Sequence, residues 1–230
     1  MYIGNQTTIL NPVYFFGKPK NSQKVVNVKI LPADVDTGIV FKRTDLKENN
    51  IIKLSYDNMV IENDNIILKN NNISISNVEN LLASIWADRL DNVIIELDGD
   101  AIPYIDGTSE PISFLLTTGR IKEFEKARNV FELNENVSVK IGNSEINLKK
   151  GNGALKIKIS NEFNSFEFDN GILPFKDTLS TINEDGDKLK LDTISTLVII
   201  FIGGKYCNFD VEFKNFNKKV AYEFFKNILK

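Results

Sequence analysis

The sequence of 230 residues contains no histidine. Ordinary usage of roughly 2% per residue predicts about five in a chain of this length. A bias toward asparagine, lysine and isoleucine explains part of this absence, but the chemical consequence is the same whatever the cause. Nowhere in this sequence can an imidazole act as a general base, a general acid or a metal ligand.

The chain is also poor in cysteine and in long apolar runs. Its single cysteine, Cys207, excludes an intrachain disulfide and indicates a reducing compartment, so we expect a cytoplasmic protein. The longest apolar stretch, residues 197–202, is far too short to span a membrane. The N-terminus has neither a basic segment nor a long apolar run, so no signal peptide is expected.

The chain also has no large excess of positive or negative charge. The chain has 28 basic and 31 acidic residues, which give a net charge of −3. Proteins that bind nucleic acid carry a concentrated basic patch, so no nucleic-acid partner is expected. Hydrophobic residues make up 42% and charged residues 26%. This composition is typical of a globular protein with a core of useful size.

Short strands are predicted in the first half, because apolar and polar residues alternate there between turns rich in asparagine and aspartate. They cover residues 25–31, 39–41, 51–56, 59–62, 66–69 and 92–97. A helix is predicted to begin at Ser76, because Ser76 and Glu79 form a capping-box pattern before an apolar run of helical period. A second helix is predicted from near Pro111 to Gly119.

The second half repeats this order after a connector at residues 126–128. Strands are predicted at residues 130–133, 137–141, 154–159, 163–168 and 207–213. Residues 188–202 fit a helix, but their β-branched content also permits a strand. A terminal helix is predicted from Asn217 onward, with apolar residues on one face.

Strands followed by helices, twice, indicate an α+β protein with two halves whose apolar helix faces pack together. We therefore predict a first domain over residues 1–125 and a second, shorter domain over residues 126–230.

Three stretches resemble the zinc-dependent UDP-3-O-acyl-N-acetylglucosamine deacetylases of lipid A synthesis. The first is VDTGIVFKRTDL at residues 35–46. The second begins with NVENLLAS at residues 77–84 and ends with IPYIDGTS at residues 102–109. The third, weaker, runs from Lys188 to the C-terminus. The resemblance implies two similar α+β domains, each a sheet with two helices, and the helices sandwiched between the sheets.

The resemblance also implies a reaction in which a zinc-bound water hydrolyses an N-acetyl amide. In that family two histidines and one aspartate hold the metal, a glutamate is the general base, and a further histidine assists. At the matching positions this chain has Glu79 for the base and Asn80 for one ligand histidine. Lys188 and Asp192 stand at the other two ligand positions, and Asn217 lies near the late histidine.

One of three metal ligands remains in this set, so we expect no metal, no other cofactor and no catalytic residue. An asparagine binds zinc poorly compared with imidazole or thiolate, and the ammonium group of Lys188 would repel a divalent cation. Glu79 has a structural explanation as a helix cap, and Asp192 has one as a solvated helix residue.

The stretch between Phe168 and Lys188 is short and polar. The family carries a β-α-β insert in its second half that builds a passage for the acyl chain. The stretch in this chain is too short for that insert, so we expect the acyl passage to be missing or collapsed.

The sequence therefore predicts a non-catalytic relative of the deacetylases, a pseudoenzyme that acts as a protein-binding, scaffolding or regulatory module. Its partner would be an active enzyme or a second copy of the chain. Two alternatives stay open. One is a hydrolase with altered, metal-independent chemistry on an N-acetyl sugar nucleotide, using Glu79, Lys188 and Asp192 differently. The other is a sugar-nucleotide binder without turnover.

Overall fold

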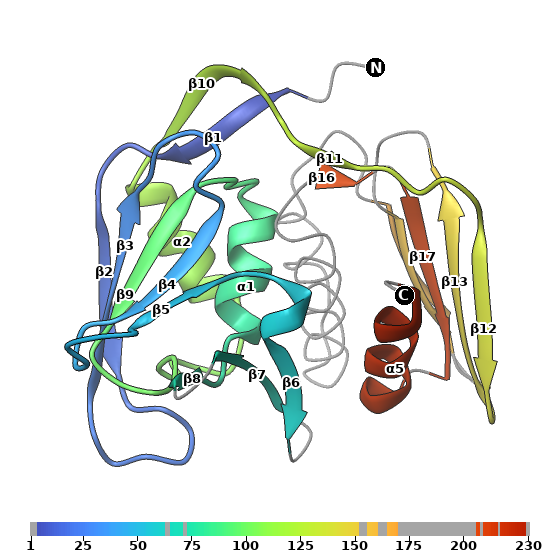
Figure 1. The fold of residues 1–230 in the computed structure, drawn as a ribbon, viewed down its shortest axis with the longest axis horizontal. Coiled ribbons are helices and arrows are strands. Elements are labelled where there is room, and N and C mark those ends of the chain that lie inside the picture. Colours follow the sequence, from blue (N-terminus) through green and yellow to red (C-terminus); the bar gives the residue numbers. More distant parts are fainter. Residues whose placement is uncertain are drawn as a thin grey trace.

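The computed structural model describes residues 4–62, 65–70, 73–151, 156–160, 165–169, 206–207, 209–215 and 217–228. Two five-stranded sheets stand apart, and described helices lie between them (Figure 1). The helices are α1 (Glu79–Ala87), α2 (Glu110–Thr118) and α5 (Lys218–Ile228). Figure 1 shows α1 on the side of the first sheet that faces the second, and α5 on the side of the second that faces the first. The predicted α+β class with sandwiched helices is confirmed.

The N-terminal sheet has the strand order β2-β3-β9-β4-β5. Its strands are β2 (Val13–Gly17), β3 (Val26–Pro32), β4 (Ile39–Arg43), β5 (Ile51–Lys53) and β9 (Val93–Leu97). All neighbouring pairs are antiparallel except β4 and β9, which are parallel. Alternate residues of β3 face the core, since Val26, Val28 and Ile30 are buried. That alternation confirms the face predicted from the sequence.

The C-terminal sheet repeats this arrangement with the order β12-β13-β17-β14-β15. Its strands are β12 (Val137–Ile141), β13 (Ser144–Lys150), β14 (Lys156–Ser160), β15 (Ser165–Asp169) and β17 (Phe209–Lys214). Again only one pair, β14 with β17, is parallel. Both sheets place their last strand in the centre, so the halves share one topology.

Smaller sheets complete the fold. A three-stranded sheet contains β6 (Met59–Glu62), β7 (Asn65–Asn70) and β8 (Ile73–Ile75). Two-stranded sheets pair β1 (Asn5–Ile9) with β10 (Ile121–Ala127) and β11 (Val130–Phe131) with β16 (Tyr206–Cys207). The predicted strand at residues 51–56 ends early, because η1, a 3-10 turn at Tyr56–Asn58, follows β5.

The predicted connector at residues 126–128 is wrong in part, since β10 continues to Ala127 and pairs with β1. Arg128 then packs against the first half through Asp91. The chain thus stays with the N-terminal sheet beyond residue 125, and the division into 1–125 and 126–230 stays a prediction.

Helix ends follow local sequence signals at α2 and α5. α2 has Pro111 in its first turn and Gly119 at its C-cap, as predicted. α5 buries Ala221 and Phe224, two residues of the predicted apolar face. Every described helix is too short or too polar to cross a bilayer. The segment 188–202, predicted as helix or strand, lies outside the described residues.

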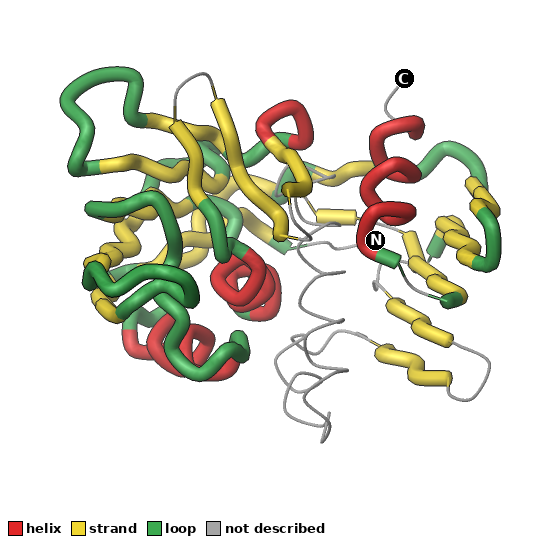
Figure 2. The backbone as a smooth tube through the Cα atoms, turned by 90° about the horizontal axis from the view of Figure 1, so that it is seen from below, coloured by secondary structure: helices red, strands yellow, loops and turns green. Residues whose placement is uncertain are grey.

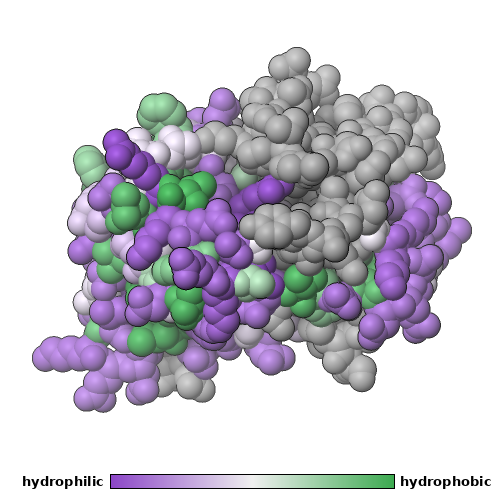
Figure 3. All heavy atoms as spheres, turned by 90° about the horizontal axis from the view of Figure 1, so that it is seen from above, coloured by the Kyte–Doolittle hydropathy of each residue, from purple (hydrophilic) through white to green (hydrophobic). Residues whose placement is uncertain are grey.

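In Figure 2 the described helices and strands of the N-terminal half lie on one side of the view and those of the C-terminal half on the other. Seen from above, the described surface mixes scattered apolar residues with a larger hydrophilic area (Figure 3). Such scattering is ordinary for a folded chain and does not by itself mark an interface on that face.

Candidate functional site

The start of α1 carries the two positions that resemble the family's catalytic base and first metal ligand. α1 begins at Glu79 with Val78 as its N-cap, and no side chain caps it. The predicted capping box is therefore wrong. Ser76 instead forms an isolated bridge with Ala101, and its hydroxyl donates to the carbonyl of Asp100. The intervening Asn77 has a φ of 57°, and this left-handed turn directs Ser76 away from the helix.

The Glu79 carboxylate is engaged with the neighbouring strand instead. Its Oε1 accepts a hydrogen bond from the backbone N–H of Ile66, the second residue of β7, at 3.1 Å. The N-terminus of a helix favours negative charge, which suits a carboxylate at this position. Glu79 therefore joins α1 to the three-stranded sheet.

Asn80 follows on the same turn and is half-buried. Its backbone carbonyl accepts the hydroxyl of Ser84 at 2.8 Å, and that hydroxyl lies equally close to the carbonyl of Ser109. An amide oxygen is a hard, neutral donor, so Asn80 offers zinc far less than an imidazole would.

Asn217, the position near the late histidine, is the N-cap of α5. Its Oδ1 accepts the backbone N–H groups of Lys219 at 3.0 Å and of Val220 at 3.2 Å. The sequence already contained this signal, because an asparagine directly before an apolar run of helical period is a preferred N-cap. The amide oxygen of Asn217 is thus committed to the helix.

A chain of contacts connects these two helix starts. Glu79 holds β7, β7 pairs with β6, and β6 contacts α5 through Tyr222, whose hydroxyl donates to the carbonyl of Met59 at 3.5 Å. The ring of Tyr222 also stacks on Tyr56, with centroids 6.2 Å apart. Burial against this ring raises the pKa of Tyr56. The small sheet therefore joins the two halves at this point.

Lys188 and Asp192 lie outside the described residues, so the structure places three of the five expected positions. It sets Glu79 beside Asn80 and puts Asn217 on the other half. Within the described part of the chain, no three acidic, cysteine or histidine side chains gather as a metal site would require.

A family model described as LpxC, UDP-3-O-acyl N-acetylglycosamine deacetylase, matches residues 6–182. The chain belongs to this family. One relative is the UDP-3-O-acyl-N-acetylglucosamine deacetylase of Ruthia magnifica, 30% identical over 188 residues, which are 81% of this chain and 56% of the relative. The corresponding protein of Thioalkalivibrio sulfidiphilus is 30% identical over 73% of this chain and 55% of the relative. That of Shewanella frigidimarina is 36% identical over 64% of this chain and 49% of its own length.

The chain spans about half the length of the deacetylases it matches. The family match includes Glu79 and Asn80 and ends before the other three positions, Lys188, Asp192 and Asn217. The match therefore covers the start of α1 and not the start of α5.

The side chains at the positions of the family's metal ligands do not fit zinc. Zinc sites in proteins use imidazole, thiolate and carboxylate ligands, typically four. Here the chain has no imidazole at all, and Asn80 and Lys188 put a neutral amide and an ammonium group at two of the three ligand positions. We therefore derive no catalytic step through a metal at these residues.

Proposed function

We propose that this member of the deacetylase family does not hydrolyse N-acetyl amides through zinc and acts instead by binding another protein. The observation that carries the proposal is the absence of histidine from all 230 residues. The structural use of Glu79 and Asn217 supports it.

The reaction implied by the family needs a hydroxide near neutral pH, which zinc provides by lowering the pKa of its bound water. An amide at Asn80 and an ammonium at Lys188 cannot replace two imidazoles in that role. Glu79 on its own would meet no activated water, because a general base contributes only when the reacting water is bound and polarised within its reach.

A protein partner is proposed because the framework remains while the donor set for chemistry is lost. Both sheets, their shared topology and the helices between them are present. A scaffold of this kind offers surfaces without turnover. We propose an active enzyme of the same family, or a second copy of this chain, as the partner in the cytoplasm.

The test begins with the full chain purified without chelators. We expect no stoichiometric zinc by elemental analysis and no release of acetate from UDP-3-O-acyl-N-acetylglucosamine. Glu79→Gln keeps an oxygen that can accept the Ile66 N–H, so it should fold like the original protein. One zinc per chain, together with turnover that Glu79→Gln abolishes, would overturn the proposal.

Partner binding is measured separately. Tagged protein is recovered from its native cells, and light scattering gives the mass of the purified chain. We expect either a stoichiometric co-purified enzyme of the family or twice the chain mass. A monomer without any stoichiometric partner would contradict the scaffolding role, while leaving the loss of zinc chemistry to the first experiment.

A further inference from the structure

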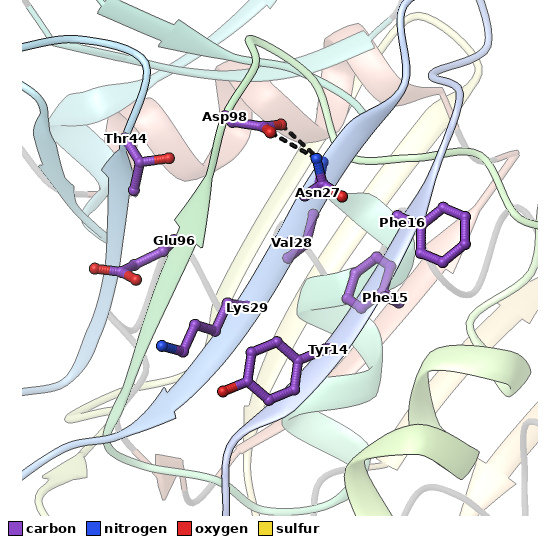
Figure 4. Close-up of a pocket in the computed structure, with 9 residues that line it drawn as sticks. All are labelled: Tyr14, Phe15, Phe16, Asn27, Val28, Lys29, Thr44, Glu96 and Asp98. Atoms are coloured by element: carbon purple, nitrogen blue, oxygen red, sulfur yellow. Dashed lines mark hydrogen bonds between the residues drawn. The ribbon is translucent and has the colours of Figure 1, made fainter.

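The outer face of the N-terminal sheet contains a groove. The groove encloses ≈ 400 Å³ and runs across β2, β3 and β9 (Figure 4). The side chains on its walls are aromatic on one side and polar on the other: Tyr14, Phe16, Asn27, Lys29, Glu96 and Asp98. Figure 4 draws Tyr14 beside Lys29, and Asn27 linked to Asp98.

Strand register places these side chains in two rows. Tyr14 pairs with Lys29, and Lys29 pairs with Glu96, so the three stand side by side across the sheet. The Lys29 ammonium lies 5.5 Å from the centre of the Tyr14 ring, a cation–π distance. Glu96 is held in turn by Lys42, at 2.9 Å. The first row is therefore ordered before any ligand arrives.

The second row is ordered by a carboxylate. Asp98 accepts the backbone N–H and the side-chain amide of Asn27, each at 2.7 Å. Phe16 pairs with Asn27 on the adjacent strand. An acceptor with two short bonds is fixed in orientation, and a carboxylate has further lone pairs that can accept additional hydrogen bonds.

The aromatic wall is unusually exposed for a sheet. Tyr14 is 62% and Phe16 73% exposed, whereas the alternate residues Val13 and Phe15 are buried on the opposite face. A single exposed aromatic residue needs no explanation. Two on one strand, beside a hollow with convergent polar groups, are typical of a ligand groove.

The balance of charge indicates what kind of ligand fits. The walls carry Lys29, Glu96 and Asp98, and Lys42, which is bound to Glu96, balances the second carboxylate. These four charges sum to zero, so no excess positive charge is present to attract a phosphate or a polyanion. It offers both hydrogen-bond donors and acceptors next to an aromatic face. A pyranose has a face of C–H groups and a rim of hydroxyls, and aromatic faces attract such C–H groups.

We propose that this groove binds a neutral saccharide, which stacks on Tyr14 and donates hydroxyl hydrogen bonds to Glu96 and Asp98. The groove lies on the opposite side of the sheet from α1, so the inference does not rest on the loss of zinc chemistry. It holds or fails whether or not the chain hydrolyses an amide.

The test titrates the full chain with cellotriose, maltotriose and chitotriose, each up to about 10 mM, and follows saturation transfer from protein to sugar by NMR. We expect at least one sugar to bind. Tyr14→Ala removes the stacking face and should weaken binding about three- to tenfold. Tyr14→Phe keeps the ring and should bind within about twofold of the original protein.

The matched control is Phe114→Ala. Phe114 is 69% exposed on α2, far from the groove in sequence and on another element, so this change should leave the affinity unchanged. Three results would overturn the proposal: no transfer to any of the sugars, equal binding by Tyr14→Ala, or equal weakening by Phe114→Ala. A dimer that Tyr14→Ala converts to a monomer would also reject it, because a second copy would then occupy the groove.

Discussion

The two five-stranded sheets have the same strand order and the same single parallel pair, but they differ in how the central strand leads into the next helix. In the first half β9 ends at Leu97 and α2 begins at Glu110, so residues 98–109 form a long connection. In the second half β17 ends at Lys214 and α5 begins at Lys218. Asn217, the last residue of this short connection, accepts two of the first N–H groups of α5.

Strand pairing gives the two sheets the same topology. The connections between the central strand and the next helix determine which polar side chains are used for structural hydrogen bonds. The long connection of the first half holds Asp98, which helps to line the outer groove. In the short connection of the second half, Asn217 caps α5 and the Asn215 amide donates to the carbonyl of Asn143. A position that resembles a catalytic residue in sequence thus has a structural duty in this chain.

The cores of the halves also differ in kind. The N-terminal sheet buries mainly β-branched residues such as Val28, Ile30 and Ile95, whereas the described part of the second half buries three phenylalanines among leucine, isoleucine, valine and alanine. Phe131 meets Phe209 edge to face, with ring centres 6.0 Å apart. Edge-to-face aromatic pairs add to burial energy, which suits the smaller described core of the second half.

The largest expected loss of stability comes from removing Arg128, which tests whether this residue belongs to the structure of the first half. Arg128 donates to Asp91 at 2.9 Å, and its side chain is only 5% exposed. Arg128→Met keeps an apolar stem but leaves the buried carboxylate unpaired, which should lower the free energy of unfolding by about 3 to 5 kcal/mol. Urea denaturation measures this loss.

The control for that variant is Lys126→Met, two residues earlier. Lys126 pairs with Asp36 at the exposed surface, where solvent screens the charges, so its loss should lower the free energy of unfolding far less than the loss of Arg128. Burial already raises the pKa of Asp91 against the opposing effect of Arg128. Arg128→Met should therefore regain part of its stability as the pH is lowered, because a neutral Asp91 needs no partner. Equal losses in the two variants would place Arg128 outside the first half's structure.

A smaller effect on the free energy of unfolding distinguishes Asn217 from Asn80, the two described positions at which the family has a histidine. Asn217→Ala removes the N-cap of α5 and should lower the free energy of unfolding by about 1 kcal/mol. Asn217→Asp should retain it, because a carboxylate caps equally well. Asn80→Ala, at an uncapped helix start, should change stability by less than about 0.5 kcal/mol. Thermal or urea unfolding of the three variants checks this order, and a reversed order would return Asn80 to consideration as a structural or binding residue.

The smallest effect is a pH dependence at exposed carboxylates, one in each half. Hydrogen bonds from Gln6 and then Lys126 lower the pKa of Asp36 to about 2. Because the folded-state pKa lies below the unfolded one, Asp36 contributes stability above about pH 4, and this contribution is lost as the pH falls toward 2. Asp36→Asn should therefore flatten the decline of the melting temperature between these values.

Glu145 is the counterpart in the second half. Asn147 first, and then Lys214, lower the pKa of Glu145. Glu145→Gln should likewise flatten the acid limb of the stability curve. Melting temperatures measured every half unit of pH compare the two variants, and an unchanged acid limb in both would mean that neither carboxylate is linked to folding.

Local signals in the sequence predicted the elements they govern. The alternation of β3, the proline and glycine at the ends of α2, and the apolar face of α5 all depend on neighbours within a few residues. β1 and β10 were not predicted because their pairing joins Thr7 to Glu123 across the whole first half. The capping box failed for the same reason, since Ser76 finds its partners at residues 100–102.

The sequence alone restricted the chemical groups that this chain offers, because folding adds no imidazole to a chain without histidine. It also determined the family, through motifs that are contiguous in the chain. Only the tertiary structure decided that Glu79 binds a strand N–H and that Asn217 caps a helix. It alone brought Tyr14, Lys29 and Glu96 into one row, since strand pairing joins residues that are far apart along the chain.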